Sequence, residues 1–198
     1  MVILSLANVL PDGCWRYPKR EDCEGTCILP KGVKDGGFAF MRNARRLDNG
    51  HFLVAHYGDQ CVKEYDANGK VVWKLDVPGG PHSLTRLPNG HTLIAVADKD
   101  QNPRLIEVTP EGKTIWEISN ADIPGKPLKV FSEGFQYFSD GRFLITNWTG
   151  HVNPKEKVHL LLVDRQKNVL YSLENTPELQ TMSSVYSTDK PAGVASYH

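Results

Sequence analysis

The sequence predicts an all-β fold, a β-propeller of four-stranded antiparallel blades in an open or partial arc. The main observation is a repeat: residues 47–55 (LDNGHFLVA) recur at 87–95 (LPNGHTLIA) and, more weakly, at 138–145 (FSDGRFLI). The runs between the turns are short and rich in β-branched residues, which favours strands over the helices of a helical solenoid. Because Asn-Gly tolerates positive φ, the Asn-Gly pairs at 49–50 and 68–69 predict type I′ hairpin turns.

The period of the repeat is that of a propeller blade. Gly50 and Gly90 are 40 residues apart, and Trp73 and Trp116 are 43 residues apart. A period of 40 to 45 residues with four strands per repeat is typical of propellers. From Gly90 to Gly141 the spacing is 51 residues, which indicates an insertion of about ten residues before the third copy.

Three whole blades and two half blades are predicted within a single domain over residues 1–198. The half blades cover 2–17 and 181–198, and the whole blades cover about 38–77, 82–118 and 133–175. In the first whole blade the four strands are expected at 42–47, 51–56, 61–66 and 70–75. The loops over 18–37 and 120–133 are rich in Pro and Gly, and long loops in compact domains are often functional.

Composition excludes several classes of partner. The chain has 23 Lys and Arg against 23 Asp and Glu, and this zero net charge argues against a nucleic-acid-binding protein. The sequence has no run of about 18 apolar residues, so no membrane span is predicted. Residues 1–10 are apolar but lack a basic n-region and a cleavage site, so they predict a strand rather than a signal peptide. The expected location is the cytoplasm, unless the chain is N-terminally truncated.

The four cysteines, at positions 14, 23, 27 and 61, predict no metal site because their spacing is not that of zinc ligands. Cys23 and Cys27 are expected to be free thiols, with a local disulfide as the alternative in an oxidising compartment.

A large aromatic residue recurs near the end of each blade, at Trp73, Trp116 and Tyr171, with Trp15 in the first half blade. A residue that recurs at one strand position in every blade is expected to pack between adjacent sheets rather than to bind a ligand.

Candidate functional residues come from aligning the blades. Arg42, His82 and Glu133 stand at the same position, at the start of the innermost strand that lines a propeller's channel. A channel mouth is where propellers usually bind small ligands. An Arg, a His and a Glu converging there can bind an anion and transfer a proton, with His82 as the catalytic candidate.

Further ligand-binding candidates occupy neighbouring positions. Asn43 and Ser83 follow the first two, while His56 and Asn147 end the second strands of their blades, with Asp98 and His151 on the loops beyond. Two histidines directly after the Asn-Gly turns, His51 and His91, are expected to point to solvent without a role.

Residues 81–94 (PHSLTRLPNGHTLI) and 64–73 (EYDANGKVVW) resemble the blades of arylsulfotransferase-like and PQQ-like propellers. The resemblance covers about residues 38–175. In bacterial arylsulfotransferases of this type a channel histidine carries the sulfuryl group, and His82 matches the position of such a histidine. PQQ would need stacking tryptophans and bound calcium, for which the sequence holds no set, so no cofactor is predicted.

Two functional hypotheses follow. The first is a binding or scaffold module with a small-ligand pocket at the channel mouth, its partner an unknown small molecule or protein. The alternative is an arylsulfotransferase-like or lactonase-like enzyme that uses His82, with Arg42 holding the anionic group. An open arc would expose apolar blade flanks, with residues such as Ile3, Leu161 and Val163, so self-association into a homodimer through the open blade edges is also predicted.

Overall fold

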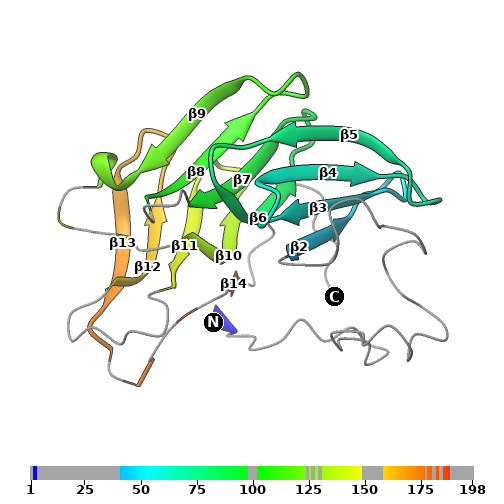
Figure 1. Cartoon of the computed structure of the whole chain (residues 1–198). Coiled ribbons are helices and arrows are strands. Elements are labelled where there is room, and N and C mark those ends of the chain that lie inside the picture. Colours follow the sequence, from blue (N-terminus) through cyan, green and yellow to red (C-terminus); the bar gives the residue numbers. More distant parts are fainter. Residues whose placement is uncertain are drawn as a thin grey trace.

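The computed structural model describes residues 2–3, 41–97, 102–123, 125, 128, 131–148, 158–176, 178–179, 182 and 185–187. Within these ranges the chain forms three four-stranded antiparallel sheets, each a simple up-and-down meander in chain order. The sheets fan out side by side without closing into a ring (Figure 1). The prediction of an all-β propeller arc is therefore confirmed.

The twelve strands of the three sheets follow the repeat. The first sheet contains β2 (Met41–Arg46), β3 (Phe52–His56), β4 (Cys61–Tyr65) and β5 (Val71–Asp76). The second contains β6 (Gly80–Arg86), β7 (Thr92–Ala97), β8 (Pro103–Val108) and β9 (Thr114–Ser119). The third contains β10 (Phe131–Tyr137), β11 (Phe143–Asn147), β12 (Val158–Val163) and β13 (Val169–Glu174). Strand β6 contacts both β2 and β10, so the first strands of the three sheets are the innermost (Figure 1).

The first hairpin turns differ from the expected type I′ geometry. Gly50 has φ 82° and donates to the Leu47 carbonyl over 2.9 Å, whereas Asn49 is not among the residues with positive φ. The loop is therefore a three-residue one, a type I turn closed by a left-handed glycine. Gly90 and Gly141 repeat it with φ 85° and 89°. A left-handed backbone at this third position explains why each copy has glycine there.

Two apolar cores separate the three sheets. Between the first and second sheets lie Leu53, Ala55, Ile94 and Val96, and Trp73 packs against this core. A second apolar core, which includes Leu93, lies between the second and third sheets, and Trp116 packs against it. The packing role is thus confirmed for both tryptophans, but not for Tyr171, which is 54% exposed on the outer strand β13.

The expectation that Leu161 and Val163 form an exposed flank is wrong. Both are fully buried against the second sheet. Alternate residues of a strand face opposite sides, so Leu160 and Leu162 of β12 face away, where Leu160 is buried with Met182 and Val185. Because β12 is apolar on both faces, its sequence pattern could not tell these sides apart.

The two ends of the described chain meet. Strand β1 (Val2–Ile3) pairs antiparallel with β14 (Tyr186–Ser187), and β14 contacts the inner strand β10. The predicted strand over 181–188 is thus present in shortened form. The remaining segments of the half blades, at 4–17 and 188–198, lie outside the described residues, as do Cys23, Cys27 and Trp15.

A short 3-10 helix, η1 (Asn120–Asp122), follows β9. Its Asp122 accepts a bond from Lys167 of the third sheet over 2.8 Å, which joins this connection to the next blade. Among the described elements no helix has the length and apolar character needed to cross a bilayer.

Candidate functional site at the start of the inner strands

The inner strands carry an irregularity at the same place in all three sheets. The ladder shifts between Met41 and Asn43 in β2, between Pro81 and Ser83 in β6, and between Phe131 and Phe135 in β10. Arg42 and His82 are therefore the extra residues of equivalent β-bulges. A bulge re-aims a side chain out of the regular pleat and is over-represented beside active sites.

Arg42 and His82 meet around the ring of Tyr57, which lies in the turn after β3. The Arg42 guanidinium carbon is 5.0 Å from the centroid of the Tyr57 ring. The His82 ring approaches the same tyrosine edge-on, with ring centroids 5.0 Å apart at an interplanar angle of 72°. This contact joins the first blade to the second, so the predicted convergence of Arg42 and His82 has a geometric counterpart.

Gly80 makes room for this tyrosine. A Cβ built at Gly80 would lie 2.3 Å from Cε2 of Tyr57 and 2.4 Å from its Cδ2, closer than any real side chain approaches. The tyrosine ring thus rests directly on the backbone at the start of β6. Sequence reasoning missed Tyr57 because it has no counterpart in the repeat: the equivalent residues are Ala97 and Trp148.

The electrostatics of His82 keep it neutral at neutral pH. Burial, and to a smaller extent the positive charge of Arg42, lower the pKa of His82 from 6.5 to about 4. A neutral imidazole offers one N–H donor and one nitrogen lone pair. The lone pair can act as a nucleophile, a base or a hydrogen-bond acceptor.

Asn43 and Ser83 occupy the next position of their strands, and both are buried. Asn43 pairs across the ladder with Ala55, which belongs to the core between the first and second sheets. Cross-strand partners share a face of the sheet, so the Asn43 side chain faces the second blade. Its Oδ1 and the Nε of Arg42 are buried atoms without a hydrogen-bond partner.

His56 does not join this group. It lies on the opposite face of the first sheet, and its Nε2 is 3.0 Å from the hydroxyl oxygen of Tyr65. Burial lowers the pKa of His56 to about 4, assisted by Lys63 and opposed by Asp59. Because strand parity sends residues 55 and 56 to opposite faces, the end of β3 does not bring His56 to the second blade.

The side chain of Asn147 joins two strands of the third sheet. It is 2% exposed, and its Nδ2 donates to the Val158 carbonyl over 2.8 Å, bridging β11 and β12. The Asn147 side chain is therefore occupied in joining these two strands rather than available to a ligand. Glu133 lies in β10, but its side chain is outside the described part of the structure, as are Asp98 and His151.

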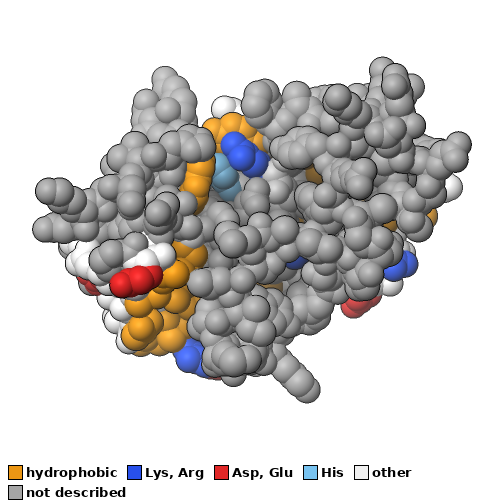
Figure 2. Space-filling model, turned by 90° about the horizontal axis from the view of Figure 1, so that it is seen from below, with side chains coloured by type: hydrophobic (Ala, Val, Ile, Leu, Met, Phe, Trp, Pro, Cys, Tyr) orange, Lys and Arg blue, Asp and Glu red, His pale blue; other side chains and the backbone are white. Residues whose placement is uncertain are grey.

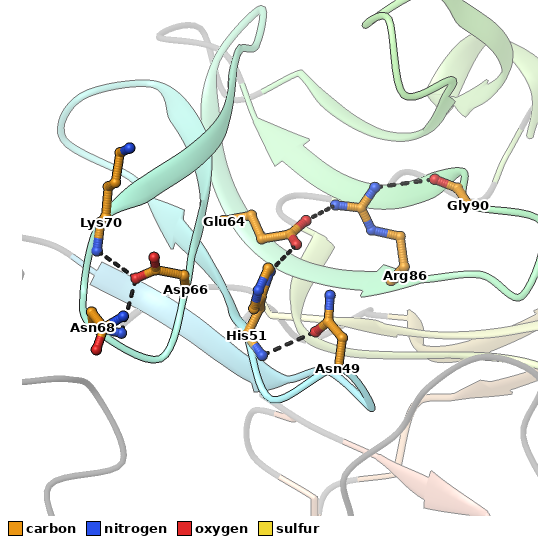
Figure 3. A network of polar contacts seen from close by, with 8 residues as sticks. All are labelled: Asn49, His51, Glu64, Asp66, Asn68, Lys70, Arg86 and Gly90. Carbon is orange, nitrogen blue, oxygen red and sulfur yellow. Dashed lines mark hydrogen bonds and ion pairs between the residues drawn. The ribbon is translucent and has the colours of Figure 1, made fainter.

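The opposite end of the first blade interface contains a different cluster, which overturns the expectation for His51. Glu64 accepts from Nδ1 of His51 over 2.8 Å and forms an ion pair with Arg86 of the second blade at 2.7 Å (Figure 3). We call this set the first rim clamp. Arg86 also lies over the Trp73 ring at 4.9 Å and donates to the Gly90 carbonyl.

The second blade interface repeats the arrangement as the second rim clamp. Glu107 pairs with Nδ1 of His91 at 2.7 Å and with Arg165 of the third blade at 2.5 Å. Arg165 in turn lies over the Trp116 ring at 5.2 Å. His91, like His51, is therefore held by a carboxylate instead of pointing freely to solvent. The shared His and Glu positions of the repeat were visible in the sequence, but their pairing was not.

Within the described residues no group of His, Cys, Asp and Glu has the arrangement of a metal site.

Seen from below, the surface shows a histidine next to a cationic side chain, and both lie beside hydrophobic side chains (Figure 2). Cys61 is buried with a free thiol, and burial raises its pKa, so it is not a reactive nucleophile.

The sequence matches no protein-family model and no curated protein sequence. A solved structure of a protein of unknown function from Bacteroides caccae is similar, with a TM-score of 0.62 and 22% identity. The match covers 72% of this chain and 52% of that one, so this chain spans about half the length of that relative. The likeness supports the fold.

Two further solved structures are more distant. Hydrazine synthase of Kuenenia stuttgartiensis has a TM-score of 0.47 at 13% identity, covering 77% of this chain and 38% of that one. The WD40 domain of Neurospora crassa Pan2 has a TM-score of 0.42 at 9% identity, covering 67% and 35%.

Proposed function

We propose that the protein is a propeller-type binding module that holds a small anionic ligand at the channel mouth through Arg42 and His82. The observation that carries the proposal is an imbalance of charge between the described residues at the two ends of one blade interface. At the rim, Arg86 and His51 share the carboxylate of Glu64. At the mouth, Arg42 and His82 share the Tyr57 ring, and the pKa of His82 responds to Arg42 and to no carboxylate.

A cation beside a neutral histidine is a suitable anion site. Arg42 supplies a fixed charge whose planar fork matches a carboxylate or sulfate group. His82 supplies a donor without a second charge. Mouths of propeller channels are common places for small ligands, and the bulges direct both side chains away from the regular pleat.

The experiment is a titration of the protein with benzoate and phenyl sulfate at pH 7, followed by NMR chemical shifts. We expect saturable shifts in wild type and their loss in Arg42→Gln. Arg46→Gln is the matched control, because Arg46 belongs to the same strand but is exposed at its other end. Equal binding by wild type and Arg42→Gln would contradict the proposal, as would the absence of binding by either anion.

The second candidate is an arylsulfotransferase-like or lactonase-like enzyme that uses His82. It is favoured by one observation, the neutral imidazole of His82, since an unprotonated nitrogen is required for nucleophilic attack. Turnover of aryl sulfate esters or lactones by wild type, lost in His82→Ala, would support the enzyme. Anion binding without turnover would support the binding module and contradict the enzyme.

Self-association is the proposed partner interaction. The outer strand β13 ends the third sheet and exposes Val169, Leu170 and Tyr171 at 37%, 51% and 54%. An exposed apolar edge strand is a template for pairing with a second copy. Light scattering should detect a dimer of the 22.1 kDa chain that Leu170→Lys weakens. A monomer at all concentrations would contradict this.

A further inference from the structure

We propose that the anion preferred at the Arg42–His82 site bears a hydroxyl or ammonium group on the carbon next to its carboxylate, as α-hydroxy and α-amino acids do. This inference rests on the proposed function and specifies its ligand. It depends on the buried polar atoms of two adjacent residues, one a donor and one an acceptor.

The donor is on Arg42. Its Nε is buried and makes no hydrogen bond. A buried polar group left without a partner costs about 1–3 kcal/mol. A carboxylate that accepts from the guanidinium edge would satisfy this N–H and neutralise the charge at the same time.

The acceptor is on Asn43. The side chain is 6% exposed, faces the second blade, and its Oδ1 makes no hydrogen bond. An amide oxygen cannot pair with a carboxylate, since both only accept. The ligand must therefore bring an O–H or N–H to satisfy it.

The two residues belong to one bulge, in which consecutive residues of β2 oppose a single residue of β3. One small ligand can therefore serve both side chains. An acid with its donor on the carbon next to the carboxylate is the smallest ligand that presents an anion and a donor together. His82 adds a further donor and acceptor from the second blade and strengthens contact with such a polar ligand.

The experiment compares acids that differ only in the α-hydroxyl group, lactate against propionate and mandelate against phenylacetate, by NMR titration of the intact chain at pH 7. We expect the hydroxy acid of each pair to bind roughly 5–10-fold more tightly, the effect of one net hydrogen bond. In Asn43→Leu this preference should fall to within about 2-fold, because the acceptor for the hydroxyl group is gone.

The outcomes separate the two proposals. If carboxylates bind in an Arg42-dependent manner without a hydroxyl preference in wild type, the ligand class is wrong and the anion site stands. A preference that persists in Asn43→Leu would also overturn the role of Asn43. If no acid binds, the proposed function itself fails. The wild-type comparison needs no variant, so the test holds even if Asn43→Leu does not fold.

Discussion

The two ends of the first blade interface use the same residue types in opposite ways. At the rim, an arginine and a histidine converge on Glu64, and every charge has a partner within 2.8 Å. At the mouth, an arginine and a histidine converge on the uncharged ring of Tyr57. At the rim, paired charges join the two blades. At the mouth, none of the described carboxylates pairs with Arg42, and a cation without a counter-charge favours an added anion. The rim is therefore expected to act in stability and the mouth in binding.

The two rim clamps also differ from each other. In both, the Glu and the His come from equivalent positions of the repeat. The arginines do not: Arg86 ends an inner strand, while Arg165 belongs to the turn before an outer strand. The third blade has Leu162 opposite Tyr171 where the others have Glu opposite Trp. The third blade thus lacks the carboxylate on which a rim clamp is built.

The largest expected effect is on packing at the second interface. Trp116 stacks on Phe143 with centroids 4.7 Å apart and donates to the Arg165 carbonyl over 2.9 Å. Trp116→Ala should lower the free energy of unfolding by about 3 kcal/mol or more, since it empties a large aromatic site. Urea unfolding measures this. The control Tyr171→Ala should change it by less than about 0.5 kcal/mol because Tyr171 is exposed. Equal losses would mean that the third blade has a partner surface.

Breaking the rim clamps comes next. Glu107 is 2% exposed, and Glu107→Ala leaves His91 and Arg165 without their carboxylate. We expect a loss of about 2–4 kcal/mol, as for other buried pairs from which one partner is removed. Glu64→Ala should cost less, about 1–2 kcal/mol, because Glu64 is 13% exposed and a solvated pair is weaker. The reverse order in chemical denaturation would show that burial does not rank the two clamps.

The pH dependence of stability tests the mouth. His82 has a pKa of about 4 in the folded protein against 6.5 as its ordinary value. The unfolded chain therefore takes up this proton first as pH falls. The contribution of His82 to the free energy of unfolding is fully present above about pH 6.5. It is lost progressively as the pH falls towards 4, by up to about 3 kcal/mol. His82→Gln should flatten this decline and leave the part due to His56. An unchanged profile would place the His82 pKa near its ordinary value.

The smallest effect on stability is expected for Arg42→Gln. No carboxylate in the described part of the chain pairs with Arg42, so removing this partly buried cation should change the free energy of unfolding by less than about 1 kcal/mol. The same change should raise the pKa of His82, because Arg42 is one of the two causes that lower it. An NMR titration of the His82 ring protons measures the shift. A large loss of stability with no change in the pKa would make Arg42 a structural residue like Arg86.

Much of the candidate site was predictable because the repeat aligns equivalent positions. Arg42 and His82 occupy one position of the blade, so their approach followed from the alignment. Tyr57 was missed because it occupies a turn where the other blades have different residues. His56 was misplaced because neighbouring residues of a strand face opposite sides of the sheet. The alignment of the repeats does not show which of the two sides faces the next blade.

The sequence by itself determined the strands, the positions of the turns and the number of four-stranded sheets, because these depend on local chemistry: the period-2 apolar pattern and a glycine where φ is positive. Only the tertiary structure decided which faces meet. Leu161 and Leu162 are identical neighbours, yet one is buried between sheets and the other faces away. The pairs Glu64–Arg86 and Glu107–Arg165 join residues 22 and 58 positions apart. Such contacts depend on how one sheet packs on the next, and no local pattern contains that information.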